Sequence, residues 1–247
     1  MAAARPRTLP AAIVPVLVGL ALASRAGPLD GLTAAATLGA ALLIQIGTNL
    51  ANDYYDFVRG ADTSERVGPT RITQAGLAEP SVVRNAALAV LGAAALIGVH
   101  LVSVGGLPIL VIGILSLVLA IAYTGGPWPL AYHGLGDVFV FLFFGVIAVN
   151  GTVWLQGVRP SPLSLAASLP VASLATAILV VNNLRDIVTD ARAGKRTLAV
   201  RLGAAAARAE YVALLAVALS VPLLLARFTG PRVLIALGAL PLAAVVA

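Results

Sequence analysis

The sequence has no cysteine, only two histidines and few charged residues. The absence of cysteine from all 247 residues excludes disulfides, thiolate nucleophiles and cysteine-ligated metals. Charged residues make up 11% of the chain, well below the roughly 25% of an ordinary soluble domain. The net charge of +6 does not indicate nucleic-acid binding. The basic residues lie in loops between apolar runs, where membrane orientation accounts for most of them.

Apolar residues are abundant instead, at 60% of the chain with a mean hydropathy of +1.00. Most of the apolar runs approach or exceed the roughly 20 residues that a helix needs to cross a bilayer, and the alternating polarity of a β-barrel is not visible. The sequence therefore predicts an all-α polytopic membrane protein, with one domain over residues 1–247. The last run is still apolar at Ala247, so we expect the chain to be cut short. The runs are at 9–24, 29–58, 81–104, 107–125, 134–157, 163–185, 207–227 and 231–247.

The basic residues predict the orientation of these helices. If the N-terminus is cytoplasmic, only Arg25, Arg159, Arg227 and Arg232 of the 16 basic residues fall on the opposite side. Excess positive charge marks the cytoplasmic side, so we expect a multi-pass protein of a bacterial cell membrane with a cytoplasmic N-terminus.

Two clusters of amides and carboxylates end apolar runs on the predicted cytoplasmic side. Asn49, Asn52, Asp53 and Asp56 have the spacing of one helix face, and so do Asn182, Asn183, Asp186 and Asp190. A charge at a helix centre costs about 2.5–3.5 kcal/mol on insertion scales, so nearby arginines or a bound metal should compensate these acids. Oxygen ligands without histidine or cysteine suit Mg²⁺, which commonly bridges carboxylates to substrate phosphates.

Basic residues follow both clusters. Arg59, Arg66 and Arg71 come after the first, and Arg192, Lys195 and Arg196 after the second. Carboxylates, a divalent cation and a basic surround together favour a diphosphate ligand, because arginine binds phosphate oxygens bidentately. A lone aspartate at a helix end is usually a solvated cap, and we expect that simpler role for Asp137, which opens the run at 134–157.

Six stretches of the sequence resemble a known family. "NDYYDFVRGAD" (52–62) and "NNLRDIVTDARAGKRT" (182–197) resemble the two aspartate-rich motifs of the UbiA superfamily of intramembrane prenyltransferases. Within it, "RPRTLPAAIVPVLVG" (5–19), "GPTRITQAG" (68–76), "YTGGPWPLAYHGLGD" (123–137) and "GKRTLAVRLG" (194–203) resemble the 1,4-dihydroxy-2-naphthoate polyprenyltransferases of menaquinone biosynthesis.

The resemblance implies a bundle of about nine transmembrane helices around a central cavity, of which eight runs are visible here. It implies a Mg²⁺-dependent aromatic polyprenyltransferase acting on an isoprenyl diphosphate and 1,4-dihydroxy-2-naphthoate. CO₂ and diphosphate would be released, giving demethylmenaquinol and, after oxidation, demethylmenaquinone. Membrane lipid is an implied partner, nucleic acid is not, and a homo-oligomer is compatible with the sequence.

The same resemblance assigns roles to residues. It implies that five aspartates bind Mg²⁺: Asp53, Asp56, Asp62, Asp186 and Asp190. The residues that it implies to be catalytic are Asp53, Asp56, Asp186, Asp190 and Tyr123. Tyr123 would face the prenyl cation, although an interfacial tyrosine would look the same in sequence. The expected substrate-binding residues are Asn49, Asn52, Arg59, Arg71, Gln74, Asn183, Lys195 and Arg196, with Gln74 equally suited to bonding loop backbone.

The chain departs from the family pattern after Tyr123, where several relatives carry a basic pair and this chain has "TGGPW". Part of the diphosphate site must then come from Arg71, Lys195 or Arg196. Two alternatives stay open: a UbiA-type enzyme with another acceptor, such as 4-hydroxybenzoate or homogentisate, and an ion-coupled transporter, since intramembrane acids often mark ion paths.

Overall fold

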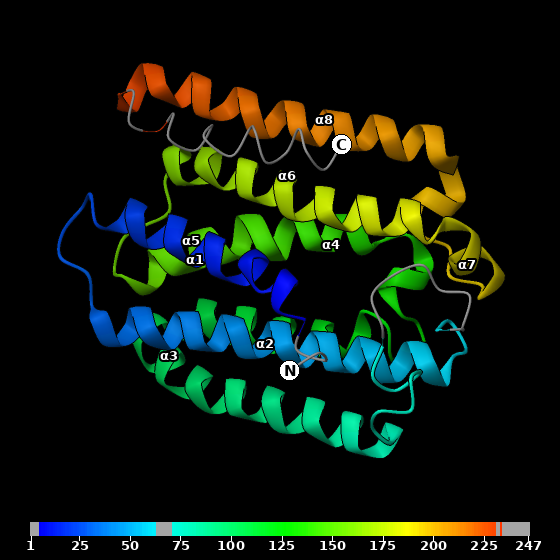
Figure 1. Cartoon of the computed structure of the whole chain (residues 1–247). Helices are drawn as coiled ribbons and strands as arrows, with labels where there is room; N and C mark the ends of the chain where they lie inside the picture. The colour runs from blue at the N-terminus through cyan, green and yellow to red at the C-terminus, as the bar shows by residue number, and fades with distance from the viewer. Residues whose placement is uncertain (1–4, 63–70, 231–232, 234–247) are drawn as a thin grey trace.

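The computed structural model describes residues 5–62, 71–230 and 233, and within those residues it is helical with no strand (Figure 1). Six of its helical stretches are long and apolar enough to cross a membrane. The predicted all-α polytopic membrane fold is therefore confirmed, although the run at 231–247 lies almost wholly outside the described residues. The elements are η2 (Pro6–Thr8), α1 (Pro10–Ala23), α2 (Gly31–Val58), α3 (Pro80–Ala122), η3 (Leu130–His133), α4 (Gly136–Val140), η4 (Phe141–Ile147, a π-helix), α5 (Ala148–Leu155), α6 (Pro162–Arg185), α7 (Ile187–Arg192) and α8 (Leu198–Thr229).

The 43-residue element α3 contains two spans. A straight helix of that length would measure about 65 Å, twice the roughly 30 Å of a bilayer core. Gly106 interrupts it with φ 67° and ψ −153°. Val83 packs in one cluster with Tyr55, and Gly125, beyond the other end, also lies against the Tyr55 ring. The chain therefore reverses at Gly106, as the two sequence runs at 81–104 and 107–125 predict.

Helix ends lie where the local sequence places them. Asp30 accepts hydrogen bonds from the backbone N–H groups of Leu32 and Thr33 at the start of α2. At the other end of α2, Gly60 adopts φ +69°, and Ala61 N donates to Asp56 O at 2.8 Å. This glycine closure stops the helix before Asp62 and turns that carboxylate back toward it.

Small residues let the helices approach closely. A Cβ on Gly145 would lie 2.1 Å from Ala172 Cβ, where η4 meets α6, and one on Gly19 would lie 2.6 Å from Thr152 Cβ, where α1 meets α5. Such contacts are typical of membrane bundles, in which close packing replaces the hydrophobic driving force between helices.

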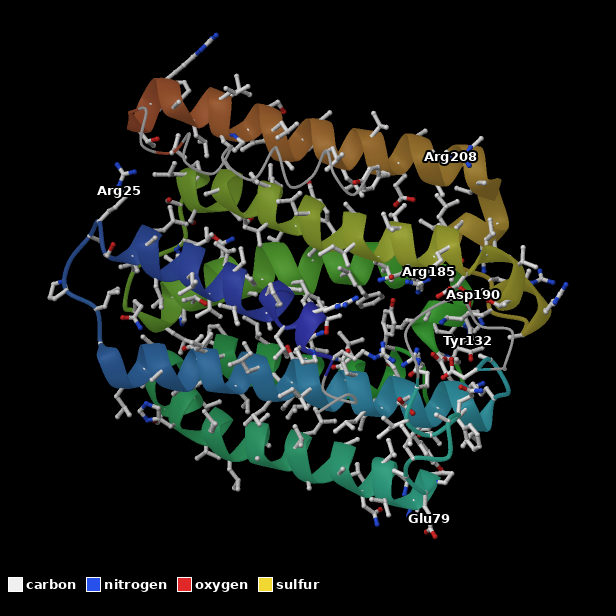
Figure 2. All side chains as sticks on the ribbon, in the orientation of Figure 1. Arg25, Glu79, Tyr132, Arg185, Asp190 and Arg208 are labelled. Carbon is white, nitrogen blue, oxygen red and sulfur yellow. The ribbon has the colours of Figure 1, made fainter. Side chains whose placement is uncertain are left out.

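The two ends of the bundle differ in charge. Figure 2 shows Tyr132, Arg185 and Asp190 gathered near one end of the bundle, with Arg25 at the opposite end. The end of α2, the start of α3, α7 and the start of α8 all lie toward the first of these ends (Figure 1), which we call the acidic end. Both aspartate clusters are therefore on one side of the bundle, as the sequence predicts.

Candidate active site

The first aspartate cluster is held by the segment that follows it. Asp53 is buried, and its two carboxylate oxygens accept hydrogen bonds at 3.1 Å from the backbone N–H groups of Ile72 and Thr73. Arg71 Nη2 donates to Asp56 Oδ2 at 3.1 Å, and Arg71 Nε lies 3.3 Å from Asp62 Oδ2. One buried arginine thus pairs with two buried carboxylates, so its removal would leave buried negative charge without a partner arginine.

The second cluster lies where a helix breaks. The spacing of residues 182–190 predicts one continuous helix face, but α6 ends at Arg185 and Asp186 departs from helical backbone with φ −94° and ψ 10°. The short helix α7 then carries Asp190. Asn183, Asp186 and Asp190 are nevertheless all buried. Arg185 donates two hydrogen bonds to the carboxylate of Asp186, of 2.8 and 2.7 Å.

Lys195 joins the two clusters. Its Nζ lies 3.8 Å from Asp56 Oδ2 and 3.8 Å from Asp190 Oδ1. Carboxylates that are more than 130 residues apart in the sequence therefore share one cation. Tyr132 lies at the same point: its hydroxyl donates to Asp56 Oδ1 at 3.2 Å, and Lys195 Nζ is 5.8 Å from its ring centre. The backbone of Arg196 donates to Tyr132 O at 3.2 Å, which fixes the two loops together.

The remaining expected residues surround this centre in different ways. Asn49 donates to Thr8 Oγ1 at 3.0 Å, and Asn52 accepts from Thr124 Oγ1 at 2.8 Å. Arg59 lies 5.2 Å above the Tyr132 ring and also donates to Gly126 O. Gln74 is half-buried after Arg71, whereas the side chain of Arg196 is exposed. Tyr123 follows α3, and its backbone carbonyl accepts from Ala131 N at 2.9 Å.

Sequence reasoning missed three contributors to the site. Tyr132 bonds Asp56, Arg185 pairs with Asp186, and Thr8 bonds both Gln45 and Asn49. The position of Arg185 immediately before an aspartate was a signal for the pairing. Thr8 and Tyr132 lie in an N-terminal turn and a loop far from the clusters in sequence, so helical spacing could not find them.

Two tyrosines near the clusters have strongly raised pKa values. The pKa of Tyr123 is raised well above its usual range by burial, and then by the charges of Asp137, Asp56 and Asp190. The pKa of Tyr132 is also raised, by burial and by the charge and hydrogen bond of Asp56. Both phenols are therefore neutral hydrogen-bond donors at physiological pH.

The donor set at this end consists of carboxylate oxygens, which is the ligand chemistry of a hard divalent cation. Within the residues that the structure describes, no group of three or more acidic or histidine side chains is already arranged to hold a metal. Asp56, Asp62, Asp186 and Asp190 are instead paired with Arg71, Arg185 and Lys195, and Asp53 accepts from backbone N–H groups. The two clusters thus converge around positive charge, and that charge is supplied by the protein itself.

Comparison with known proteins agrees with this geometry. Residues 12–247 match the model of the UbiA prenyltransferase family. The chain belongs to this family. The transport alternative, which rested on intramembrane acids alone, has no comparable support.

Curated relatives narrow the comparison. The chain is 45% identical over 215 residues to the 1,4-dihydroxy-2-naphthoate octaprenyltransferase of Mycobacterium tuberculosis, covering 87% of this chain and 73% of that protein. It is 42% identical over 217 residues to the enzyme of the same name from Escherichia coli, covering 85% and 70%. A UbiA homolog from Archaeoglobus fulgidus, solved with DMAPP and Mg²⁺, has the same fold, with a TM-score of 0.66 at 17% identity over 89% of this chain and 74% of that one.

Proposed function

We propose that the protein transfers a polyprenyl group from an isoprenyl diphosphate to 1,4-dihydroxy-2-naphthoate, releasing CO₂ and diphosphate. The product is the demethylated menaquinol, which oxidises to demethylmenaquinone. Prenyl transfer to an aromatic acceptor follows from the family, and relatives at 40–45% identity that carry the naphthoate enzyme's name support this acceptor.

The observation that carries the proposal is the shared contact of Lys195 with Asp56 and Asp190. A site that breaks an allylic diphosphate must place positive charge where the leaving oxygens become negative. The structure brings two acidic helix ends and their basic residues to one place. The buried Arg71 Nη1 has no hydrogen-bond partner within the described residues, so it can serve a phosphate oxygen.

The carboxylates fit Mg²⁺ by their chemistry. We assign Asp53, Asp56, Asp62, Asp186 and Asp190 as the residues that would hold it. When bound, the cation supplies Lewis-acid stabilisation of the departing diphosphate. Arg71, Lys195 and Arg59 bind and orient the diphosphate, and the apolar helices keep water away from the allylic cation. The half-buried Tyr123 presents its ring to that cation.

The orientation is part of the proposal. Arg185 and Arg208 lie toward the acidic end, whereas Arg25 lies at the other end (Figure 2). The excess of basic residues on the first side supports a cytoplasmic active site, where the water-soluble acceptor is available and the released diphosphate can leave. The prenyl tail is then drawn from the surrounding membrane.

A purified-protein assay tests the proposal. The protein in lipid nanodiscs receives a polyprenyl diphosphate with 1,4-dihydroxy-2-naphthoate, 4-hydroxybenzoate or homogentisate in separate reactions. We expect a decarboxylated, prenylated product from the naphthoate alone, and none in excess EDTA. Preferred turnover of either other acid would overturn the acceptor, and full activity in EDTA would overturn the cation.

A further inference from the structure

The proposed reaction needs a proton acceptor, and this inference rests on that reaction. The ring carbon that bears the carboxylate becomes nucleophilic when the neighbouring hydroxyl releases its proton. The five motif aspartates are poorly suited to accept it, because they sit among arginine, lysine and backbone donors. His133 is equally unsuited: its Nδ1 lies 2.9 Å from Pro129 O, and its ring stacks on Trp128 at 4.2 Å.

Asp137 is the carboxylate that stands apart at the acidic end. It is 4% exposed, and neither of its oxygens has a hydrogen-bond partner within the described part of the chain. Our sequence expectation that it caps a helix is wrong, because α4 begins one residue earlier and its cap, Leu135, makes no side-chain bond. A buried carboxylate without partners is costly, so its presence calls for an explanation.

The surroundings of the Tyr123 phenol include Asp137 and both acidic clusters. A Cβ on Gly136 would lie 2.8 Å from the Tyr123 hydroxyl, so this phenol lies directly against the residue before Asp137. Burial raises the pKa of Tyr123, and the charges of Asp137, Asp56 and Asp190 raise it further. Asp137 therefore lies in the same neighbourhood as the Tyr123 phenol, which the charges of both acidic clusters also affect.

The backbone around Asp137 is also unusual. Asp137 is the second residue of α4, and this short helix continues directly as the π-helix η4, a rare geometry that is frequent at functional sites. Together with the unpartnered carboxylate and the close Tyr123 phenol, this makes the start of α4 a distinct element of the site.

We propose that the Asp137 carboxylate takes the proton of the acceptor hydroxyl that neighbours the carboxyl-bearing ring carbon, and later returns it. In the first step that ring carbon bonds to the allylic carbon, and the C–O bond to diphosphate breaks with its electron pair leaving on diphosphate. The hydroxyl oxygen becomes a carbonyl and its proton moves to Asp137.

The second step restores the ring. The bond to the carboxylate breaks, CO₂ leaves, and the electron pair of that bond returns to the ring and its oxygen. The resulting enolate recovers the proton from Asp137, which leaves a quinol and a carboxylate ready for another cycle. The sequence of steps consumes neither oxidant nor reductant.

Single-turnover kinetics test this role with matched variants. Asp137→Asn keeps the size of the side chain but cannot take the proton, and we expect the prenyl-transfer rate to fall about 100- to 1,000-fold. Glu210→Gln, which removes another half-buried carboxylate from the nearby helix α8, should stay within twofold of wild type. Binding of an unreactive thiolodiphosphate donor analogue should stay within twofold in both variants. An Asp137→Asn rate within threefold of wild type would overturn the inference.

Acceptor acidity separates proton transfer from a structural role. Ring-halogenated naphthoates have more acidic hydroxyl groups, so the deficit of Asp137→Asn should shrink steadily along that series. A deficit of constant size would overturn the inference. The methyl ether of that hydroxyl tests the step in wild type: we expect a rate loss of about 100-fold or more, and an undiminished rate overturns the inference, because the proposed step needs that proton.

The outcomes keep the two proposals apart. If wild type prenylates another hydroxylated aromatic acid and not the naphthoate, the proposed acceptor is wrong, and the Asp137 comparison is made with that acid. If wild type prenylates the naphthoate and Asp137→Asn matches it, the function stands and only the inference about Asp137 is wrong.

Discussion

The two aspartate clusters, to which we assign the same role, are held in the fold by different contacts. The first is built into the fold: Asp56 and the Arg71 side chain that pairs with it are 1% and 5% exposed, and Asp53 is tied to backbone N–H groups. The second is paired with more exposed side chains. Arg185 and Lys195, which pair with Asp186 and Asp190, are 30% and 14% exposed.

This difference in exposure indicates which aspartates can exchange a cationic side chain for a ligand. Removing a buried partner leaves an uncompensated charge, whereas water replaces a partly exposed one at little cost. The first cluster therefore serves as both frame and site. We expect that the second can exchange Arg185 or Lys195 for a ligand at a smaller cost in stability.

The largest test of this comparison is Asp53→Asn against Asp186→Asn. Both should lower prenyl transfer at least about 100- to 1,000-fold, the scale of a lost electrostatic contact at a reacting centre. Only Asp53→Asn should also lower the melting temperature, because one neutral amide oxygen cannot replace a carboxylate that accepts two backbone bonds. The expected loss is about 1.5–3 kcal/mol. Turnover assays and thermal melts in one detergent measure both effects, and equal melting temperatures would remove the distinction.

Replacing Arg71 by Met tests the frame directly. Asp56 and Asp62 would remain buried without their arginine, which should destabilise the protein by about 3–5 kcal/mol. Arg84→Met is the matched control: Arg84 is exposed and, among the described residues, hydrogen-bonds only its neighbour Asn85 at 3.3 Å, so a change under about 0.5 kcal/mol is expected. Chemical-denaturation midpoints give the comparison, and a control that falls as far as the variant would contradict it.

Lys195→Met tests the link between the clusters. Without the ammonium, Asp56 and Asp190 lose the cation that they share, so a divalent ion meets less competition for them. We expect Mn²⁺ to bind about fivefold more tightly in the absence of diphosphate, equivalent to about 1 kcal/mol, while prenyl transfer falls. Electron paramagnetic resonance titration reads the binding. Weaker Mn²⁺ binding would show that Lys195 organises the acids instead of competing for them.

The sequence predicts the helices well because long apolar runs leave few other solutions in a bilayer. It also predicts both acidic clusters at one end, because charge patterning sets that side. The reversal at Gly106 was visible for the same reason: a run from 81 to 125 is too long for one crossing.

The details of the site were less predictable. Neither proline nor glycine marks the break at Asp186, so residues 182–190 look like one helix until packing places α7. The contacts of Thr8 and Tyr132 join segments that are distant in sequence. Asp137 carries the standard signal of a helix cap, but α4 begins at Gly136, and the carboxylate is buried without a hydrogen-bond partner in the described residues.

The smallest expected effect concerns the two tyrosines near the clusters. Tyr123 and Tyr132 have raised pKa values in the folded protein, so they keep their protons to higher pH than in the unfolded chain. Their contribution to stability is complete below about pH 10, the ordinary tyrosine pKa, and is lost as pH rises beyond it. Tyr132→Phe should flatten this alkaline decline and lower turnover only about threefold to tenfold, since it removes one bond to Asp56 and keeps the ring under Arg59 and Lys195. Melting temperatures from pH 8 to 11 measure the decline. An unchanged slope in the variant would mean that the Tyr132 phenol ionises freely, and that the first cluster is more open to water than its burial indicates.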